Sequence, residues 1–207
     1  MPPDLDSIMP VLGLSGSLRK ESYSTAVLRT LAEKADALIK LRLFALHEVP
    51  LYNQDLDGTS APLVVRDLRA AVRDCCGLIA CSPEYNYGMS GVLKNAIDWI
   101  SRPALKSVLV NKPVLLITCS PAYTGGARAH AQMREAFSAC LARVISRPQV
   151  VIASVNDKVA DGRLRDENTL RFAIDAVRDL VSEAQMLANS ARGTDEVSVA
   201  QENVHAT

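Results

Sequence analysis

The sequence has few of the features that mark nucleic-acid-binding or membrane proteins. Its 23 lysine and arginine residues are balanced by 23 aspartate and glutamate residues, so the formal net charge is zero. This balance argues against a basic nucleic-acid footprint and a polybasic membrane patch. No apolar run approaches the roughly 18 residues that a membrane-spanning helix needs. The acidic, proline-containing start over residues 1–6 is not typical of a signal peptide, and we expect a cytoplasmic protein.

Metal-binding and disulfide patterns are also missing. The five cysteines include the adjacent pair Cys75 and Cys76 but no CxxC spacing, and there are only three histidines. The sequence therefore predicts neither a metal site nor a disulfide framework, and reduced thiols are expected.

What remains is an ordinary globular composition with a regular alternation of two patterns. Of the 207 residues, 48% are hydrophobic and 22% are charged, which suits one domain with a full core. Short apolar runs predict strands over 8–14, 39–46, 77–81, 113–119 and 150–155. Between them, apolar residues at helical spacing predict helices over 22–38, 62–75, 90–100, 133–144 and 166–188. From about residue 190 to 207 we expect a disordered polar tail.

This alternation predicts an α/β fold. Parallel strands need helical crossovers, so the pattern favours a three-layer, doubly wound sheet of five parallel strands. Ligands of such sheets bind beyond the carboxyl ends of the strands, where the strand order reverses. The loops after the first, third and fourth strands are therefore the places to look for a site.

The loop after the first strand is rich in groups that bind phosphate. Four hydroxyls and a guanidinium stand just before a helix, whose free N–H groups favour an anion; they are Ser15, Ser17, Ser22, Ser24 and Arg19. The segment lacks both the GxxxxGK spacing of a P-loop and the GxGxxG spacing of a dinucleotide fingerprint. Any single serine is better explained as a helix cap or part of a turn. Taken together, the group predicts a phosphate site.

The loop after the third strand concentrates aromatic residues in a chain that has only 4% of them. Tyr85 and Tyr87 flank Asn86, while Gly88 and Gly91 let backbone approach a flat ligand closely. The alternatives are a well-packed surface loop or, for one tyrosine, a contact between subunits.

Three motifs together resemble the NADPH-dependent FMN reductase family. They are Gly16-Ser17-Leu18-Arg19 with Ser22, then Pro83-Glu84-Tyr85-Asn86, then the run from Gly91 to Trp99 that contains LKNAIDW. The resemblance covers about residues 11–155, and Pro50-Leu51-Tyr52-Asn53 is similar to the family's loop after the second strand. The family implies a flavodoxin-like fold and one FMN-binding domain over residues 1–207.

The resemblance also implies site residues. Ser17, Arg19, Ser22 and Ser24 would hold the FMN phosphate. Pro83, Glu84, Tyr85 and Asn86 would line the ribityl chain and the flavin ring. Ser120 would close over the flavin, with Gly125 and Gly126 behind it.

The function implied is that of an NAD(P)H:acceptor oxidoreductase. NADPH or NADH would reduce bound FMN, and a quinone, azo dye, metal oxyanion or free flavin would take the electrons. The flavin carries this chemistry, so no catalytic side chain is expected. A homodimer or homotetramer is implied as well. Two alternatives are a flavodoxin-like electron carrier, disfavoured by the lack of net charge, and a hydrolase on the same sheet, for which no carboxylate or histidine spacing is present.

Four other residues have plainer interpretations. His130 and Arg128 are expected at solvated positions of the fourth helix, and Trp99 in the core or at a subunit contact. Cys119, at the end of the fourth strand, is expected to be a small buried side chain.

Overall fold

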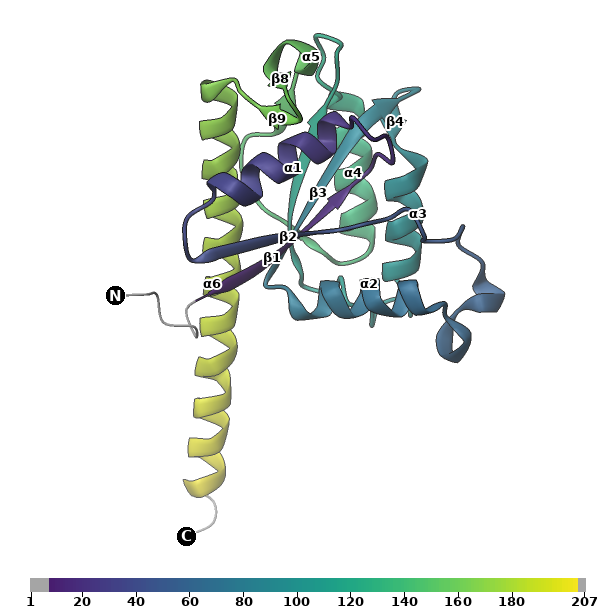
Figure 1. Ribbon diagram of the computed structural model, residues 1–207. Coiled ribbons are helices and arrows are strands. Elements are labelled where there is room, and N and C mark those ends of the chain that lie inside the picture. Colours follow the sequence, from purple (N-terminus) through teal and green to yellow (C-terminus); the bar gives the residue numbers. More distant parts are fainter. Residues whose placement is uncertain (1–7, 205–207) are drawn as a thin grey trace.

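The computed structural model describes residues 8–204, with side chains described up to residue 190. Its central sheet follows the path β2-β1-β3-β5-β6 (Figure 1). Its long parallel strands are β1 (Met9–Ser15), β2 (Ile39–Phe44), β3 (Gly77–Tyr85) and β5 (Pro113–Cys119). The edge beside β5 is split between β6 (Arg143–Val144) and β7 (Val150–Ile152), and β4 (Gly88–Met89) pairs antiparallel with β3. The predicted doubly wound sheet is confirmed.

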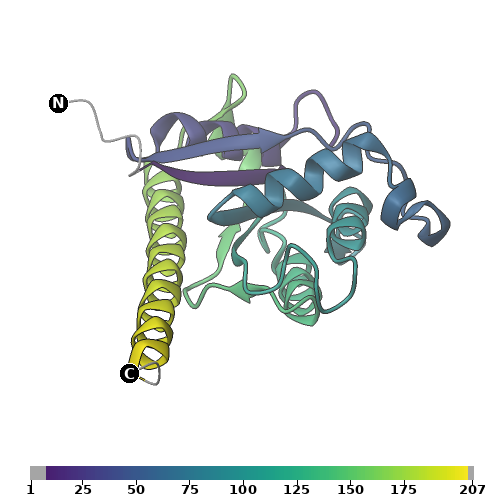
Figure 2. The ribbon, with the colours of Figure 1, turned by 90° about the horizontal axis from the view of Figure 1, so that it is seen from below.

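Helices cover both faces of this sheet (Figure 2). They are α1 (Tyr23–Lys34), α2 (Leu63–Asp74), α3 (Gly91–Ile100), α4 (Ala127–Ala139) and α6 (Glu167–Val204), while the short α5 (Val155–Lys158) follows β7 and contacts β8. Short 3-10 turns η2 (Gln54–Leu56) and η3 (Gly58–Ser60) interrupt the loop after β2, and a hairpin of β8 (Val159–Ala160) and β9 (Arg163–Leu164) precedes α6. Within the described residues, no helix is both long and apolar enough to cross a bilayer.

Two hydrophobic clusters separate the three layers. In β5, Val114 and Leu116 pack in the cluster beneath α2, α3 and α4, while Leu115 and Ile117 pack in the cluster beneath α1 and α6. Successive side chains of a strand point to opposite faces, so an unbroken apolar run is what a strand buried on both faces requires.

The structure corrects two predicted boundaries. Residues 82 and 83 do not stop the third strand, because β3 continues to Tyr85 and Pro83 pairs in register with Cys119 of β5. Proline is tolerated there because β1 ends opposite Cys81, which leaves that side of β3 without a partner strand. Val144 is not helical either: α4 ends at Ala139, and Val144 pairs with Val114 in the sheet.

The last helix is longer than predicted. Apolar spacing predicts a helix that ends at residue 188, whereas α6 continues to Val204 through most of the segment expected to be a polar tail. Residues 205–207 of that segment lie outside the described residues.

The strand order reverses between β1 and β3. Ser15 at the end of β1 is in register with Cys81, and Pro83 is in register with Cys119 at the end of β5. The loops after β1, β3 and β5 therefore meet at one edge of the sheet, as predicted for a ligand site.

Candidate functional site

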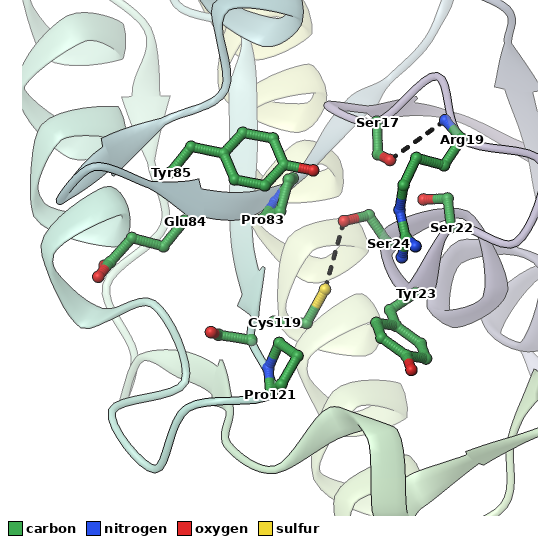
Figure 3. Close-up of a pocket in the computed structure, with 11 residues that line it drawn as sticks. Ser17, Arg19, Ser22, Tyr23, Ser24, Pro83, Glu84, Tyr85, Cys119 and Pro121 are labelled. Carbon is green, nitrogen blue, oxygen red and sulfur yellow. Dashed lines mark hydrogen bonds between the residues drawn. The ribbon is translucent and has the colours of Figure 1, made fainter.

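A cavity of about 440 Å³ opens at this edge of the sheet (Figure 3). Eight of the nine residues that the sequence predicts around the cofactor line it: Ser17, Arg19, Ser22, Ser24, Pro83, Glu84, Tyr85 and Ser120. Tyr23, Cys119 and Pro121 line it as well, and sequence reasoning did not place them in the site. The three loops thus converge on one hollow, whose floor is the end of β5.

The first loop combines a helix start with a cation. Ser22 is the N-cap of α1, and its hydroxyl accepts a hydrogen bond from the N–H of Thr25 at 3.1 Å. Ser17 accepts one from the N–H of Arg19 at 3.4 Å. The Arg19 guanidinium lies 5.4 Å from the centre of the Tyr23 ring, and no ion pair of the described residues involves it. The positive end of α1 and an unpaired arginine therefore stand at the same wall.

Ser24 plays a different part from its neighbours. Its side chain is buried, and its hydroxyl lies 3.3 Å from the Cys119 thiol in the cavity floor. A hydrogen bond with Cys119, together with burial, raises the pKa of the adjacent Cys81 thiol. This hydrogen bond between the Cys81 and Cys119 thiols lowers the pKa of Cys119, and the positive charge of Arg19 also lowers it. Cys119 is buried as expected, at 2% exposure, yet it also forms part of the cavity surface.

The aromatic wall belongs to the β3–β4 hairpin. Asn86 and Tyr87 form its turn with positive φ angles of 49° and 65°, a conformation that asparagine tolerates better than tyrosine. Tyr85, half exposed, faces the cavity, whereas Asn86 sits at the tip of the turn and does not line it. The wall is therefore made of Pro83, Glu84 and Tyr85.

Helix α4 holds this hairpin in place. The Glu84 carboxylate accepts a hydrogen bond from the N–H of Ala129 at 2.9 Å, and Figure 3 shows the side chain pointing away from the serines of the first loop. Gln132 accepts a hydrogen bond from the N–H of Met89 at 2.7 Å. The Arg128 guanidinium lies 4.0 Å from the centre of the Tyr87 ring. The Glu84 carboxylate is thus directed toward α4, and Gln132 is a supporting residue that no sequence pattern indicates.

The third loop is shaped by close packing. Gly125 has a φ of 61°, and a Cβ there would lie 2.6 Å from Val151 Cγ1. Ser120 is half buried and accepts a hydrogen bond from the N–H of Ala122 at 3.2 Å. Tyr123 is 88% exposed and does not line the cavity.

The LKNAIDW motif braces the loop after β2. Asn95 donates a hydrogen bond to the carbonyl of Pro50 at 2.8 Å and accepts one from the N–H of Tyr52 at 2.7 Å. The indole of Trp99 donates to the same carbonyl at 2.8 Å, and Trp99 is fully buried. The motif therefore acts in positioning this loop, and Trp99 is a core residue, one of the two roles expected for it.

His130 is buried, whereas the sequence predicts a solvated position for it. It is 1% exposed, and its Nδ1 has no hydrogen-bond partner among the described residues. Burial lowers its pKa, and the charge of Arg134 adds to this effect. His130 shares the inward face of α4 with Met133 and Phe137 at spacings of three and seven, a signal that the sequence contained. It does not line the cavity.

The cavity has two chemically different ends. One offers an unpaired arginine, serines and a helix start, which suit a phosphate group. The other offers a tyrosine and a proline on an open strand end, which suit a flat ring. Within the described part of the chain, no cluster of three histidine, cysteine, aspartate or glutamate side chains is arranged to hold a metal ion.

Comparisons with known proteins agree with this geometry. The model of the NADPH-dependent FMN reductase family matches residues 9–157. An NAD(P)H-dependent FMN reductase of Pseudomonas aeruginosa is 37% identical over 158 residues, which are 76% of this chain and 85% of that protein. A quinone reductase of Escherichia coli is 36% identical over 166 residues, 78% and 88% of the two chains. A solved structure, the flavoenzyme NAD(P)H:(acceptor) oxidoreductase of Paracoccus denitrificans, aligns with a TM-score of 0.77 and 30% identity over 86% of this chain and 98% of that one.

Proposed function

The chain belongs to the NADPH-dependent FMN reductase family, and we propose that it binds FMN in this cavity and passes electrons from NAD(P)H to a small-molecule acceptor. Relatives that are reductases favour an enzyme over a pure electron carrier. The proposed position of FMN rests on one observation. Eight of the residues that the family resemblance implies line one cavity, and one end of that cavity carries an arginine.

The residues divide into two groups by what they would hold. We assign the phosphate to Arg19, Ser17 and the start of α1, because Arg19 has no competing carboxylate in the described structure. The flavin ring would lie against Pro83 and Tyr85. Asn86 stays a proposed contact only through the resemblance, since its turn position keeps it off the cavity wall.

Bound FMN supplies the chemistry, which is to accept a hydride from a nicotinamide and hand the electrons on. The protein's part is to fix the ring and leave one face open to solvent. Glu84 is the acidic residue of the cavity wall, and its carboxylate is engaged by α4 rather than directed at a substrate. We therefore assign no proton donor among the side chains that line the cavity.

The acceptor and the assembly belong to the proposal as well. A quinone is supported by the quinone reductases among the relatives. We propose a homodimer or homotetramer in the cytoplasm; all five cysteines are free thiols, which suits a reducing compartment. Light scattering of the purified protein tests the assembly.

The first test is the visible spectrum of the protein with added FMN, before and after NADPH under anaerobic conditions. Flavin bands that stay with the protein and bleach on NADPH addition support the reductase. Bound flavin that neither NADPH nor NADH bleaches would identify a carrier. Protein that binds no flavin would overturn the proposal.

A further inference from the structure

A second hollow lies on the other side of Tyr23 from the flavin cavity. Its volume is about 460 Å³, and it shares two wall residues, Ser22 and Tyr23, with the first. Residues at the start of α1 line one side, and residues of the β8–β9 hairpin line the other. This hairpin lies beside α1 (Figure 1). We call this hollow the outer groove.

The walls of the outer groove are fixed to each other. Arg163 of the hairpin forms an ion pair with Glu33 of α1 at 2.6 Å. The N–H of Leu164 donates a hydrogen bond to the Thr30 hydroxyl at 2.9 Å, in a buried setting. Because these contacts join the hairpin to α1, the groove is preformed rather than dependent on a loop closing.

The groove is lined by two cations that have no acidic partner. Lys20 and Arg29 take part in no ion pair of the described residues. Of the two acids that also line it, Asp161 lies 3.8 Å from Arg165, and Glu21 is exposed in the turn before α1. Lys20 and Arg29 are therefore available to an anionic ligand.

The shared wall connects this charge to the flavin cavity. Tyr23 separates the two hollows, and the Arg19 guanidinium lies over its ring. A dinucleotide with its nicotinamide at the flavin must carry its adenosine end out of the cavity. Ser22 and Tyr23, at the start of α1, form the wall that the two hollows share, and the adenosine end would leave the flavin cavity over this wall.

We propose that the outer groove receives the adenosine end of NADPH and that Lys20 and Arg29 bind its 2′-phosphate. The proposal rests on the proposed function and deepens it, because it names the residues that distinguish NADPH from NADH. Arginine presents a planar fork that matches a phosphate, and lysine adds a point charge. NADH lacks the phosphate, so these two side chains give it no advantage.

The kinetic test uses the FMN-loaded protein and the double variant Lys20→Gln/Arg29→Gln. We expect the KM for NADPH to rise about tenfold or more while the KM for NADH stays within about twofold. Added salt should reduce the preference of the unaltered protein for NADPH. Arg66→Gln, an exposed position on α2 outside the ion pairs, is the control for the change in net charge. Equal effects on both nucleotides, or no effect, would overturn the assignment.

A binding measurement separates this inference from the proposed function. Calorimetry with 2′,5′-ADP and 5′-ADP needs no turnover; we expect the first to bind more tightly, and the difference to vanish in the double variant. If neither NADPH nor NADH reduces the FMN-loaded protein, but 2′,5′-ADP still binds more tightly than 5′-ADP, the reductase proposal fails and the assignment of the outer groove is kept. If reduction proceeds and both probes bind alike, only the groove assignment fails.

Discussion

The carboxylate of Glu84 accepts a hydrogen bond from the backbone N–H of Ala129 at 2.9 Å. This contact places a negative charge at the amino-terminal end of α4, where Gly126 has no side chain to cap the helix. It also ties the end of β3, which forms the aromatic wall of the flavin cavity, to the helix behind it. The acidic residue of the PEYN motif is therefore a helix cap supplied from a neighbouring strand.

Removing this cap should weaken the fold. We expect Glu84→Ala to lower the free energy of unfolding by about 1 kcal/mol, in line with lost N-caps and helix-dipole contacts. Glu84→Gln should lower the free energy of unfolding by less, because the amide oxygen of glutamine can still accept the hydrogen bond. Urea denaturation measures both, and Glu135→Ala, exposed on the same helix, is the control. A loss in Glu84→Ala no larger than in the control would contradict the cap.

Arg19→Ala should weaken FMN binding and leave the fold intact. The guanidinium is exposed and takes part in no ion pair of the described residues. Its loss therefore removes a binding partner of the phosphate but leaves no carboxylate of the protein without its ion-pair partner. A charge-assisted contact of about 1.5–3 kcal/mol corresponds to roughly a 10- to 100-fold higher Kd. Fluorescence titration of FMN into the apoprotein measures it, with Arg66→Ala for comparison. Unchanged affinity would remove Arg19 from the phosphate site.

His130 should make the protein less stable in mild acid. Its pKa in the folded protein lies below the ordinary value near 6.5, chiefly because burial disfavours the charged ring. The unfolded chain then binds more protons in the window between the two pKa values. The contribution of neutral His130 to the free energy of unfolding is therefore fully present above pH 6.5. It is lost as the pH falls through 6.5 toward the pKa of His130 in the folded protein.

The variant His130→Gln isolates this effect, because the other two histidines, His47 and His205, are present in both proteins. We expect the difference in unfolding free energy between wild type and variant to be constant above about pH 7 and to shrink or reverse by about pH 5. Chemical denaturation across this range measures it. A difference that does not change with pH would show that His130 is not kept neutral by burial.

Gly125 and Gly58 form a matched pair for testing close packing in the third loop. Both have positive φ angles, 61° and 69°, so both substitutions by alanine carry the same backbone penalty of about 1 kcal/mol. At Gly125 the new Cβ would also meet Ala153 N at 2.8 Å, whereas nothing lies within 4 Å at Gly58. We expect Gly125→Ala to cost about 1–3 kcal/mol more, measured as a lower Tm. Equal costs would mean that the loop moves aside freely.

Local patterns in the sequence were sufficient for the layers and for most of the site. The apolar run from Pro113 to Ile117 in β5 identifies a strand buried on both faces, and alternating strands and helices require a parallel sheet. Serines and Arg19 before a helix indicate an anion site from their own chemistry, and the PEYN and LKNAIDW motifs indicate the family.

The remaining features depended on which segments lie opposite one another. Pro83 extends β3 only because β1 ends beside Cys81, and Asn86 leaves the cavity wall only because β4 turns back against β3. The roles of Glu84 and Gln132 exist only where α4 lies behind the hairpin. A sequence determines which faces are apolar and which groups can bind, because these are properties of neighbouring residues. Strand register and helix docking bring together residues tens of positions apart, so only the tertiary structure decides which partners they meet.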